Sequence, residues 1–296
     1  MNYHNESKCV APGIVTGRSG TIGRLTYIES GPYWPHNTSL WVTDFKGNIP
    51  LFVYYLLEHI DLSRFSSGSG VPTLNRNDVH AFKTCIPSVE EQHKIADCLS
   101  IIDKRISIQN KVIEKYESLI KALAHEIIGK NAPNTMLSEC VCCTSSTLKE
   151  SDLSDAGAVP AYGAAGISGF IDSALSDGDS ILITKDGSGV GSLRYVVGHH
   201  SFVGTLNSMT PKEGVYLPYI YYALQNVCFE SYRTGQAIPH IYFKDYGKEA
   251  LYCPSFDDQK RLAKGLEMID AKIGIERAAI QNLQLVKAYL LSAMFI

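Results

Sequence analysis

Two stretches of the chain, each rich in glycine and tyrosine, carry side chains of the kinds that contact nucleic acids. Arginine, asparagine, glutamine and lysine read base edges through paired hydrogen bonds, and serine, threonine and lysine commonly bind phosphate. The candidates in the first stretch are Arg18, Ser19, Thr21, Arg24, His36, Asn37, Arg64, Asn75 and Arg76. Those in the second are Lys185, Asp186, Ser188, Arg194, His199, His200, Asn207, Arg233, Gln236 and His240. An ordinary solvated side chain is the commoner explanation for each one alone, so the prediction rests on the group.

The same stretches show no recognisable catalytic motif. The chain contains neither a GxxxxGK[ST] loop nor the Asp/Asn-Pro-Pro-aromatic tetrad of amino-methyltransferases. The glycine turns GRSGTIG and KDGSGVG each precede an expected strand rather than a helix, so the helix N-terminal amides of a phosphate loop are missing and hairpin or bulge glycines are predicted. His199 and His200 would point to opposite faces of a strand. A binding protein is favoured over an enzyme, and a stand-alone nucleic-acid enzyme is the weakest alternative.

The cysteines and the chain ends bear on metal and location. The chain has eight cysteines, and three of them cluster at Cys140, Cys142 and Cys143 without the spacing of a zinc knuckle. We therefore predict no metal and reduced thiols. The first residues do not resemble a signal peptide, and no run of about 18 apolar residues occurs. These features predict a cytoplasmic protein without a membrane span.

The charge argues against strong nonspecific binding to phosphate. The net charge is -3; residues 1–89 carry seven basic and six acidic side chains, and residues 135–256 carry seven and twelve. Because electrostatic affinity for DNA scales with the number of phosphates neutralised, this chain alone should bind weakly. A basic partner would have to contribute further contacts to phosphate.

The elements that must position these side chains occur twice, 167 residues apart. The segment IPSVEEQHKIADCLSIIDKRI (86–106) matches CPSFDDQKRLAKGLEMIDAKI (253–273), sharing the Pro-Ser start, the Gln and the Ile-Asp pair. A repeat of this length indicates a duplicated domain. We predict an α/β (α+β) fold with two mixed domains, at 1–87 and 131–254, and two long helices, at 88–130 and 255–296.

The two helices each begin with a capping box and continue as a heptad seam. Ser88 and Glu91 form the first box, and the second has Ser255 and Asp258. The seam lacks an apolar residue at Gln109 in one helix and at the equivalent Glu276 in the other. The seam residues are Ile95, Leu99, Ile102, Ile106, Ile113, Tyr116, Ile120, Leu123, Ile127, Leu262, Leu266, Ile269, Ile273, Ile280 and Leu283.

An antiparallel pairing of these helices places the two interruptions opposite each other. We therefore predict that Gln109 and Glu276 meet across the coil and fix its register, at some cost in stability. The alternative is that both side chains reach out to solvent on a loosened seam.

The sequence motifs resemble those of a known family, the DNA specificity subunit of type I restriction-modification systems. The resemblance covers nearly the whole chain and is carried by IVTGRSGTIG and ILITKDGSGVG, by SGSGVPTLN and TGQAIPHIY, and above all by the paired helix motif. In that family each mixed domain is a target recognition domain that reads one half of a bipartite site in double-stranded DNA. The long helices are spacers that pack as an antiparallel coiled coil.

The resemblance also implies partners. Two modification subunits, which carry S-adenosylmethionine and methylate adenine, dock on the helices, and a translocating restriction nuclease subunit joins them. The specificity subunit itself would catalyse nothing and hold no cofactor. Two alternatives remain, a coiled-coil scaffold that binds proteins and an inactive remnant of a specificity subunit.

The first copy departs from the second at its start. About fifty residues (131–179) precede the expected strand at Ser180, whereas thirteen precede Ile14, so the first copy would be expected to begin roughly 35 residues before Met1. We expect a first recognition domain that is N-terminally incomplete and binds DNA poorly unless complemented. Truncation, recombination, an alternative start and completion by a second polypeptide all fit this pattern.

Overall fold

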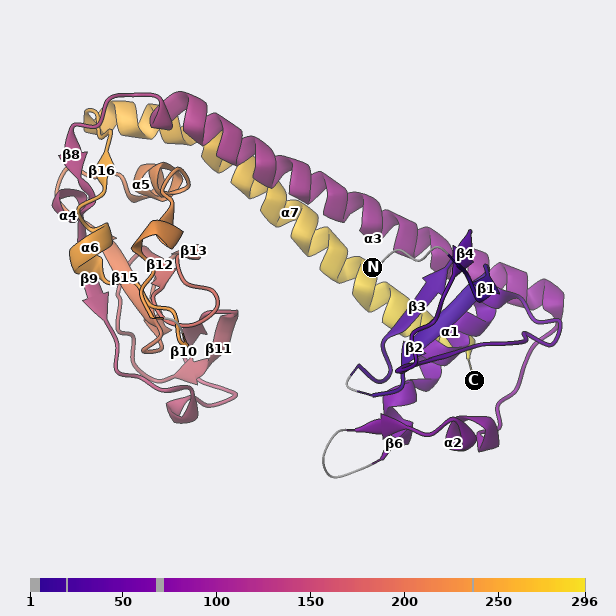
Figure 1. Ribbon diagram of the computed structural model, residues 1–296. Helices are drawn as coiled ribbons and strands as arrows, with labels where there is room; N and C mark the ends of the chain where they lie inside the picture. The colour runs from indigo at the N-terminus through magenta and orange to yellow at the C-terminus, as the bar shows by residue number, and fades with distance from the viewer. Residues whose placement is uncertain (1–5, 20, 68–71, 236, 296) are drawn as a thin grey trace. The chain divides into compact units, whose positions relative to one another are not determined.

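The computed structural model describes residues 6–19, 21–67, 72–235 and 237–295 (Figure 1). The chain divides into two compact units, of which unit 1 comprises Met1–Lys111 with Glu276–Ile296 and unit 2 comprises Val112–Ile275. Two long helices, α3 (Val89–Ala124) and α7 (Phe256–Met294), each contribute to both units. Within the described residues, none of the helices combines the length and apolar composition needed to cross a membrane.

Unit 1 is a small antiparallel sheet covered by one helix. Its central sheet has the order β3-β2-β5, and α1 packs against β2 and β3. The sheet is followed by a 3₁₀ turn (Leu62–Phe65), a short hairpin and one more helix before α3 begins. The elements are β1 (Cys9–Val10), β2 (Gly13–Gly17), β3 (Leu25–Ile28), β4 (Pro32–Tyr33), β5 (Ser39–Trp41), α1 (Pro50–Ile60), β6 (Ser66–Ser67), β7 (Thr73–Leu74) and α2 (Arg76–Ala81).

Unit 2 repeats this plan and adds strands to it. Its main sheet has the order β13-β12-β15-β9, a second sheet has the order β11-β10-β14, and β16 pairs with β8. The end of α3 continues into a π-type turn (His125–Gly129) that packs against α5. The elements are β8 (Thr135–Met136), α4 (Leu137–Cys140), β9 (Val141–Ser145), β10 (Val159–Gly163), β11 (Gly166–Ile171), β12 (Ser180–Thr184), β13 (Leu193–Val196), β14 (Ser201–Phe202), β15 (Leu206–Pro211), α5 (Leu217–Leu224), α6 (Phe243–Tyr246) and β16 (Ala250–Leu251).

The two central sheets share one strand register. Thr16 of β2 pairs with Leu40 of β5, and Ile183 of β12 pairs with Asn207 of β15, which are the same positions once the offset of 167 is removed. The predicted fold class, two repeated mixed domains joined by two long helices, is therefore confirmed. Within the described residues, the central sheet of unit 1 has three strands where that of unit 2 has four.

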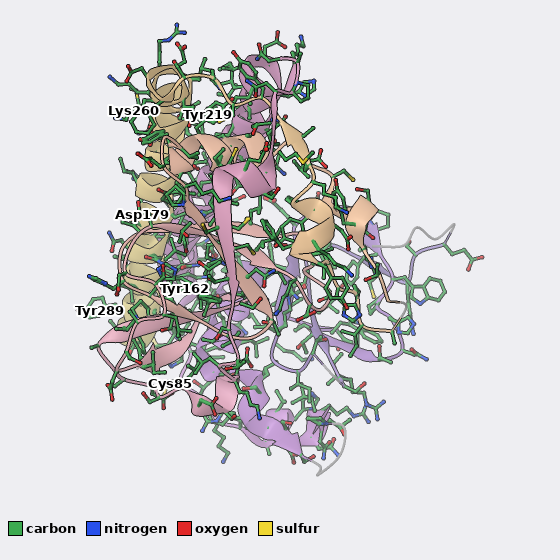
Figure 2. All side chains as sticks on the ribbon, turned by 90° about the vertical axis from the view of Figure 1, so that its left-hand side faces the viewer. Cys85, Tyr162, Asp179, Tyr219, Lys260 and Tyr289 are labelled. Atoms are coloured by element: carbon green, nitrogen blue, oxygen red, sulfur yellow. The ribbon has the colours of Figure 1, made fainter. Side chains whose placement is uncertain are left out.

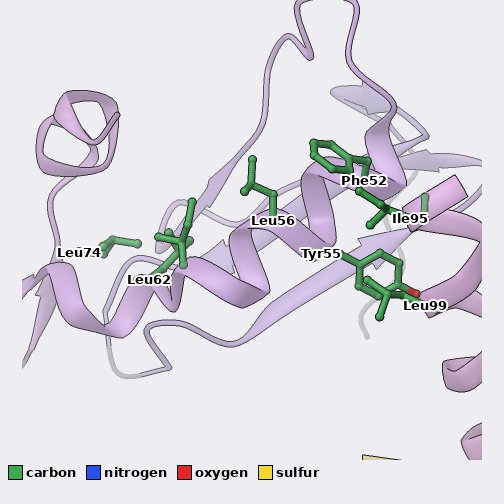
Figure 3. Close-up of a cluster of buried hydrophobic side chains, with 9 residues drawn as sticks. Phe52, Tyr55, Leu56, Leu62, Leu74, Ile95 and Leu99 are labelled. Atoms are coloured by element: carbon green, nitrogen blue, oxygen red, sulfur yellow. The ribbon is translucent and has the colours of Figure 1, made fainter. Parts of the chain in front are cut away.

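The core of unit 1 joins α1 to both long helices. Phe52 of α1 and Ile95 and Leu99 of α3 are buried in one cluster (Figure 3), against which Leu290 and Leu291 of α7 also pack. Because Ile95 lies near the start of α3 and Leu290 near the end of α7, the two helices are antiparallel within this unit. Further along the predicted seam, Ile113, Ile120, Leu266, Ile273 and Ile280 are also buried.

A buried glutamine in the first turn of each long helix forms hydrogen bonds with the mixed domain of the same unit. The Gln92 side-chain oxygen accepts from the Ile49 amide at 2.9 Å, and the equivalent Gln259 oxygen accepts from the Tyr216 amide at 2.8 Å. Each side-chain nitrogen donates to the carbonyl of the proline five residues earlier, at 3.0 and 2.9 Å. Both glutamines are at most 2% exposed, so these polar groups have little access to water.

A second contact repeated in both units joins a tyrosine of the short helix to an aspartate of the long helix. The hydroxyl of Tyr55 donates to Asp103 and that of Tyr222 donates to Asp270, both at 2.9 Å. Burial and the neighbouring carboxylate raise the pKa of each tyrosine. The phenols therefore stay protonated and keep donating at neutral pH.

In unit 1 a lysine joins this contact. The ammonium of Lys287 lies 2.9 Å from both Glu58 and Asp103 and 5.2 Å from the ring centre of Tyr55. Burial lowers the pKa of Lys287, but hydrogen bonds to Asp103 and Glu58 outweigh that effect and raise it. The position equivalent to Lys287 in unit 2 is the buried Ile120, so this ion cluster breaks the internal symmetry.

The two polar interruptions of the seam lie side by side. The amide nitrogen of Gln109 donates to a carboxylate oxygen of Glu276 at 3.3 Å, across the two helices at the edge of unit 1. The side-chain oxygen of Gln109 is buried and has no hydrogen-bond partner among the described residues. This geometry fits a polar layer within the seam rather than two side chains directed into solvent.

Replacing Gln259 by leucine is expected to destabilise unit 2. The Gln259→Leu variant leaves the Tyr216 amide and the Pro254 carbonyl without partners, which should cost about 2–3 kcal/mol in the free energy of unfolding measured by urea titration. The matched control is Gln281→Leu, an exposed glutamine on the same helix, which should change it by less than about 0.5 kcal/mol. Equal effects would contradict the role of the buried amide.

Removing Lys287 should leave two carboxylates facing each other. The Lys287→Met variant is expected to lose roughly 2 kcal/mol, because Glu58 and Asp103 are about two-thirds buried and lose their counter-ion. Adding Glu58→Gln and Asp103→Asn to the same chain should restore most of the loss. Thermal unfolding at constant pH measures both effects, and a neutral Lys287→Met would exclude the cluster as a stabilising element.

The Gln109 and Glu276 pair is expected to lower the stability of the coil and to fix the register of α3 against α7. Changing both residues to leucine is expected to raise the free energy of unfolding by about 1–3 kcal/mol while loosening the pairing of α3 with α7. Spin labels at the exposed Arg105 and Gln281 of unit 1 would report a broader distance distribution in the double variant. A single narrow distance together with unchanged stability would exclude the register role.

Candidate nucleic-acid interface

The candidate residues of the first stretch gather at one end of the unit 1 sheet. Arg18 and Ser19 follow the carboxyl end of β2, where the Arg18 amide donates to Thr38 and its carbonyl accepts from Leu74, both at 2.8 Å. Ser19 forms a β-bridge with Thr73. Two loops and the hairpin are thereby held against the end of the strand. The described residues among 18–24, 36–38 and 73–76 are called tip 1.

All nine candidates of the first stretch lie on or beside tip 1. The His36 ring contacts the Thr38 hydroxyl at 2.9 Å, and Asn75 caps α2 by accepting from the Asn77 amide. Arg64 lies beside the tip in the 3₁₀ turn, over two aromatic rings. A hollow of ≈ 520 Å³ in the tip is lined by Arg18, Leu40, Thr73, Leu74, Asn75 and Arg76.

The arginines on and beside tip 1 are exposed at the surface. Within the described part of the chain, none of Arg18, Arg24, Arg64 and Arg76 forms an ion pair. Their guanidinium groups are exposed, and exposed guanidinium groups suit bidentate contacts to phosphate or guanine. Residues 1–89 are almost neutral overall, but four of their seven basic side chains lie on or beside tip 1.

Unit 2 builds the same structure from different side chains. Lys185 and Asp186 follow β12, and the Lys185 carbonyl accepts from the Ile241 amide at 2.9 Å, as Arg18 accepts from Leu74. Asp186 forms a β-bridge with His240 and lies 3.6 Å from its ring nitrogen. The described residues among 185–192 and 233–244 are called tip 2. Ser188 and Arg233 also lie there, although Arg233 is paired with Glu230 at 2.6 Å.

Tip 2 also holds two residues that the sequence analysis missed. The ring of Tyr242 lies 5.9 Å from the ring of His240, and the ammonium of Lys244 lies 5.2 Å from the centre of the Tyr242 ring. Tyr242 is 48% exposed, so part of its side chain is accessible at the surface. The alternation of His, Tyr and Lys in HIYFK was the available signal in the sequence.

Two candidates of the second stretch were wrong as surface contacts. His200 is fully buried, where its ring bonds the Ser180 hydroxyl at 2.7 Å and contacts the Gly198 carbonyl. Asn207 is 4% exposed and donates to the buried Tyr246 hydroxyl at 3.0 Å. Both side chains complete the core of unit 2 by satisfying other buried polar groups.

Two further candidates of unit 2, among the described residues, do not gather at tip 2. His199 is exposed beside Asp177 at the start of β12, and a five-residue strand separates that end from tip 2 by about 17 Å. Arg194 is exposed in the middle of β13, opposite Leu182. Gln236 lies outside the described residues.

The described residues offer little for catalysis or metal binding. Among them, no three histidine, cysteine, aspartate or glutamate side chains converge as a metal site, and their cysteines are free thiols. A groove of ≈ 720 Å³ between α5 and the start of α7 is lined largely by tyrosine and apolar side chains. Burial and the hydrogen bond to Glu267 raise the pKa of Tyr216 there to about 12, so its phenol is a donor and not a base at neutral pH.

Comparison with known proteins agrees with this arrangement. The model of the type I restriction modification DNA specificity domain matches residues 1–118 and 141–285. A putative type I specificity subunit from Mycoplasma genitalium is 24% identical over 272 residues, covering 82% of this chain and 70% of that protein. One from Mycoplasma pneumoniae is 24% identical over 276 residues, covering 82% and 72%.

Solved structures share the fold. The crystal structure of a type I restriction-modification S subunit from M. genitalium has a TM-score of 0.64 at 20% identity and covers 99% of this chain and 85% of its own. A second structure, from a study of type I R-M complex assembly, has a TM-score of 0.52 at 15% identity. Because the family model matches most of the chain in two copies, this protein belongs to the type I restriction-modification DNA specificity family, whose members are non-catalytic specificity subunits.

Proposed function

We propose that the two tips read the two halves of a bipartite site in double-stranded DNA. The observation that carries this proposal is that tip 1 and tip 2 share one backbone plan but differ in side chains at equivalent positions. Arg18 corresponds to Lys185, and Asn75 corresponds to Tyr242. Equal scaffolds with unequal side chains suit two half-sites of different sequence, because phosphate contacts position a protein and base contacts specify the sequence.

The long helices would set the distance between the half-sites. Each helix runs without interruption from one unit into the other, α3 over 36 residues and α7 over 39. A continuous α-helix has a fixed rise of about 1.5 Å per residue, so it is suited to hold a spacer constant. The polar pair of Gln109 and Glu276 would keep the two helices in one register.

The outer faces of the helices offer a place for the modification subunits. Ile101 and Ile108 of α3 are 65% and 61% exposed, and their equivalents in α7, Met268 and Ile275, are 68% and 62% exposed. Tyr289, two heptads beyond Ile275, is 71% exposed and projects from α7 (Figure 2). Heptad spacing puts such residues on one face, and exposed apolar faces of this kind commonly bind partner helices. The repeat in both helices would allow two subunits to dock.

The partners would supply the chemistry that this chain lacks. S-adenosylmethionine would be bound by the modification subunits, and a restriction subunit would join the complex in the cytoplasm. The second candidate function, a scaffold that binds only proteins, is favoured by the acidic excess of residues 135–256, with twelve acidic against seven basic side chains. DNA-binding partners compensate for such an excess, because they add phosphate contacts.

Mapping N6-methyladenine in a host that co-expresses this chain with its modification subunit tests the proposal. We expect a split motif with a fixed spacer. Tyr242→Ala or Lys185→Ala should relax only one half of the motif, and Arg18→Ala only the other, because each residue lies on one tip. The matched control is His199→Ala, an exposed residue on unit 2 outside tip 2, which should leave the motif unchanged.

A second arm of the same experiment addresses docking. The paired change of Ile108→Glu and Ile275→Glu should abolish methylation and co-purification of the modification subunit, while the isolated chain stays folded by circular dichroism. Methylation without any sequence preference would favour the scaffold function. A palindrome built from one half-site would mean that only one tip reads DNA.

A further inference from the structure

The groove between α5 and the start of α7 combines carboxylates with aromatic rings. Its volume is ≈ 720 Å³, and its described lining contains three carboxylates and no basic side chain. All of the lining residues belong to unit 2. The acidic members and three of the aromatic ones are Asp179, Glu267, Asp270, Tyr195, Tyr216 and Phe256.

Tyrosine hydroxyls hold two of these carboxylates in fixed positions. The hydroxyl of Tyr195 donates to Asp179 at 2.9 Å, and that of Tyr216 donates to Glu267 at 2.8 Å. Burial raises the pKa of both tyrosines, that of Tyr216 to about 12, so both phenols stay protonated at neutral pH. Because a carboxylate has about four acceptor positions, each one can still accept from a further donor.

The aromatic rings at the mouth of the groove already contact one cation. The ammonium of Lys260, an exposed residue of α7, lies 4.3 Å from the ring centre of Phe256 and 6.0 Å from that of Tyr216. Phe256 is itself 41% exposed. Attraction between a cation and the face of a ring adds to the attraction of carboxylates for the same cation. The groove is therefore suited to a positively charged group.

The chemistry of the lining narrows the occupant to an arginine on a protein. Carboxylates repel phosphate, so a nucleic acid is unsuited to this groove. A guanidinium is planar, stacks on aromatic rings and donates paired hydrogen bonds to a carboxylate. The lining also includes Pro211, Val215 and Val197, of which Val197 is 74% exposed. These side chains suit the apolar stem of an arginine and apolar residues beside it.

Unit 1 does not offer the same combination of side chains. The equivalents of Tyr216, Phe256 and Glu267 are Ile49, Val89 and Ser100. The equivalent of Asp270 is Asp103, which is paired with Lys287 of this chain at 2.9 Å. A partner that uses the groove therefore contacts unit 2 in a way that unit 1 cannot reproduce.

The groove adjoins the face of α7 that is proposed above to dock a modification subunit. Met268, which belongs to that face, is 68% exposed and follows Glu267 directly in the helix. Since the two surfaces meet on one helix, a single protein can cover both.

We propose that the groove binds an arginine of the modification subunit that docks at unit 2, and that the subunit at unit 1 makes no equivalent contact. The guanidinium would donate to Glu267 and stack on the neighbouring rings. The inference rests on the proposed function, because that function names the modification subunit as the partner. It makes the two docking positions of the repeat different.

Labelling of carboxylates tests the groove in the assembled complex. The full chain, alone and co-purified with the modification subunit, is treated with a carbodiimide and glycine ethyl ester, and mass spectrometry measures the labelling of each site. Labelling of Glu267 should fall severalfold in the complex. Asp155, an exposed residue elsewhere on unit 2, is the internal control and should be labelled equally in both. Equal labelling of Glu267 in both samples would overturn the proposal.

An isosteric variant tests the charge. Glu267→Gln keeps an acceptor for the Tyr216 hydroxyl but removes the charge, so one modification subunit should bind about tenfold more weakly while circular dichroism stays unchanged. Native mass spectrometry should then show one bound subunit at concentrations where the original chain carries two. The matched control is Asp257→Asn, an exposed carboxylate of the same helix outside the groove lining, which should leave both subunits bound.

Arginine-specific labelling identifies the partner group. Phenylglyoxal should modify one arginine of the modification subunit less in the complex with the original chain than in the complex with Glu267→Gln. Absence of any such arginine would overturn the proposal, as would a lysine that is protected from acetylation in its place.

The outcomes also separate this inference from the proposed function. If the chain binds no modification subunit, both fail. If two subunits bind and Glu267→Gln changes neither their number nor the labelling, only the groove contact is excluded. Concentration-dependent dimerisation of the isolated chain that masks Glu267 would identify a second copy as the occupant and would also overturn the proposal.

Discussion

The architecture depends on two buried glutamines. Gln92 and Gln259 each sit in the first turn of a long helix and bond the backbone just before the short helix of the mixed domain. A side-chain amide that satisfies both a donor and an acceptor away from water fixes distance and orientation together. This contact sets the position from which α1 and α5 pack on the long helices and from which the Tyr–Asp contacts form. The positions of the tips depend on it in turn.

Symmetry explains why the structure contains such contacts in pairs. The sheet register, the glutamine, and the tyrosine bonded to aspartate recur at an offset of 167. These are backbone and buried polar interactions, which tolerate little substitution because an unpaired buried group costs free energy. The tips are exposed and free of that constraint. Duplication has therefore preserved the scaffold and allowed the exposed tips to diverge.

The sequence predicted what depends on local pattern and repetition. The heptads and capping residues located both helices, and the shared interruption placed Gln109 opposite Glu276 before any geometry was known. The sequence did not predict burial where it depends on strands that are distant along the chain. His200 and Asn207 look like surface polar residues until β12 and Tyr246 enclose them. Tyr242 was not among the predicted contact residues, although it is 48% exposed next to the start of the short α6.

Lys287 has an evolutionary consequence. Its partner Glu58 belongs to the mixed domain of unit 1, whereas the equivalent positions in unit 2 hold Gln225 and Ile120. A mixed domain moved between the two positions by recombination would bring a glutamate to an isoleucine, or deprive the lysine of one carboxylate. The first mismatch leaves a glutamate without a counter-ion in a partly buried place, and the second leaves Lys287 with Asp103 alone. The Lys287–Glu58 pair therefore makes the two positions of this twofold repeat different and restricts which mixed domain can occupy each of them.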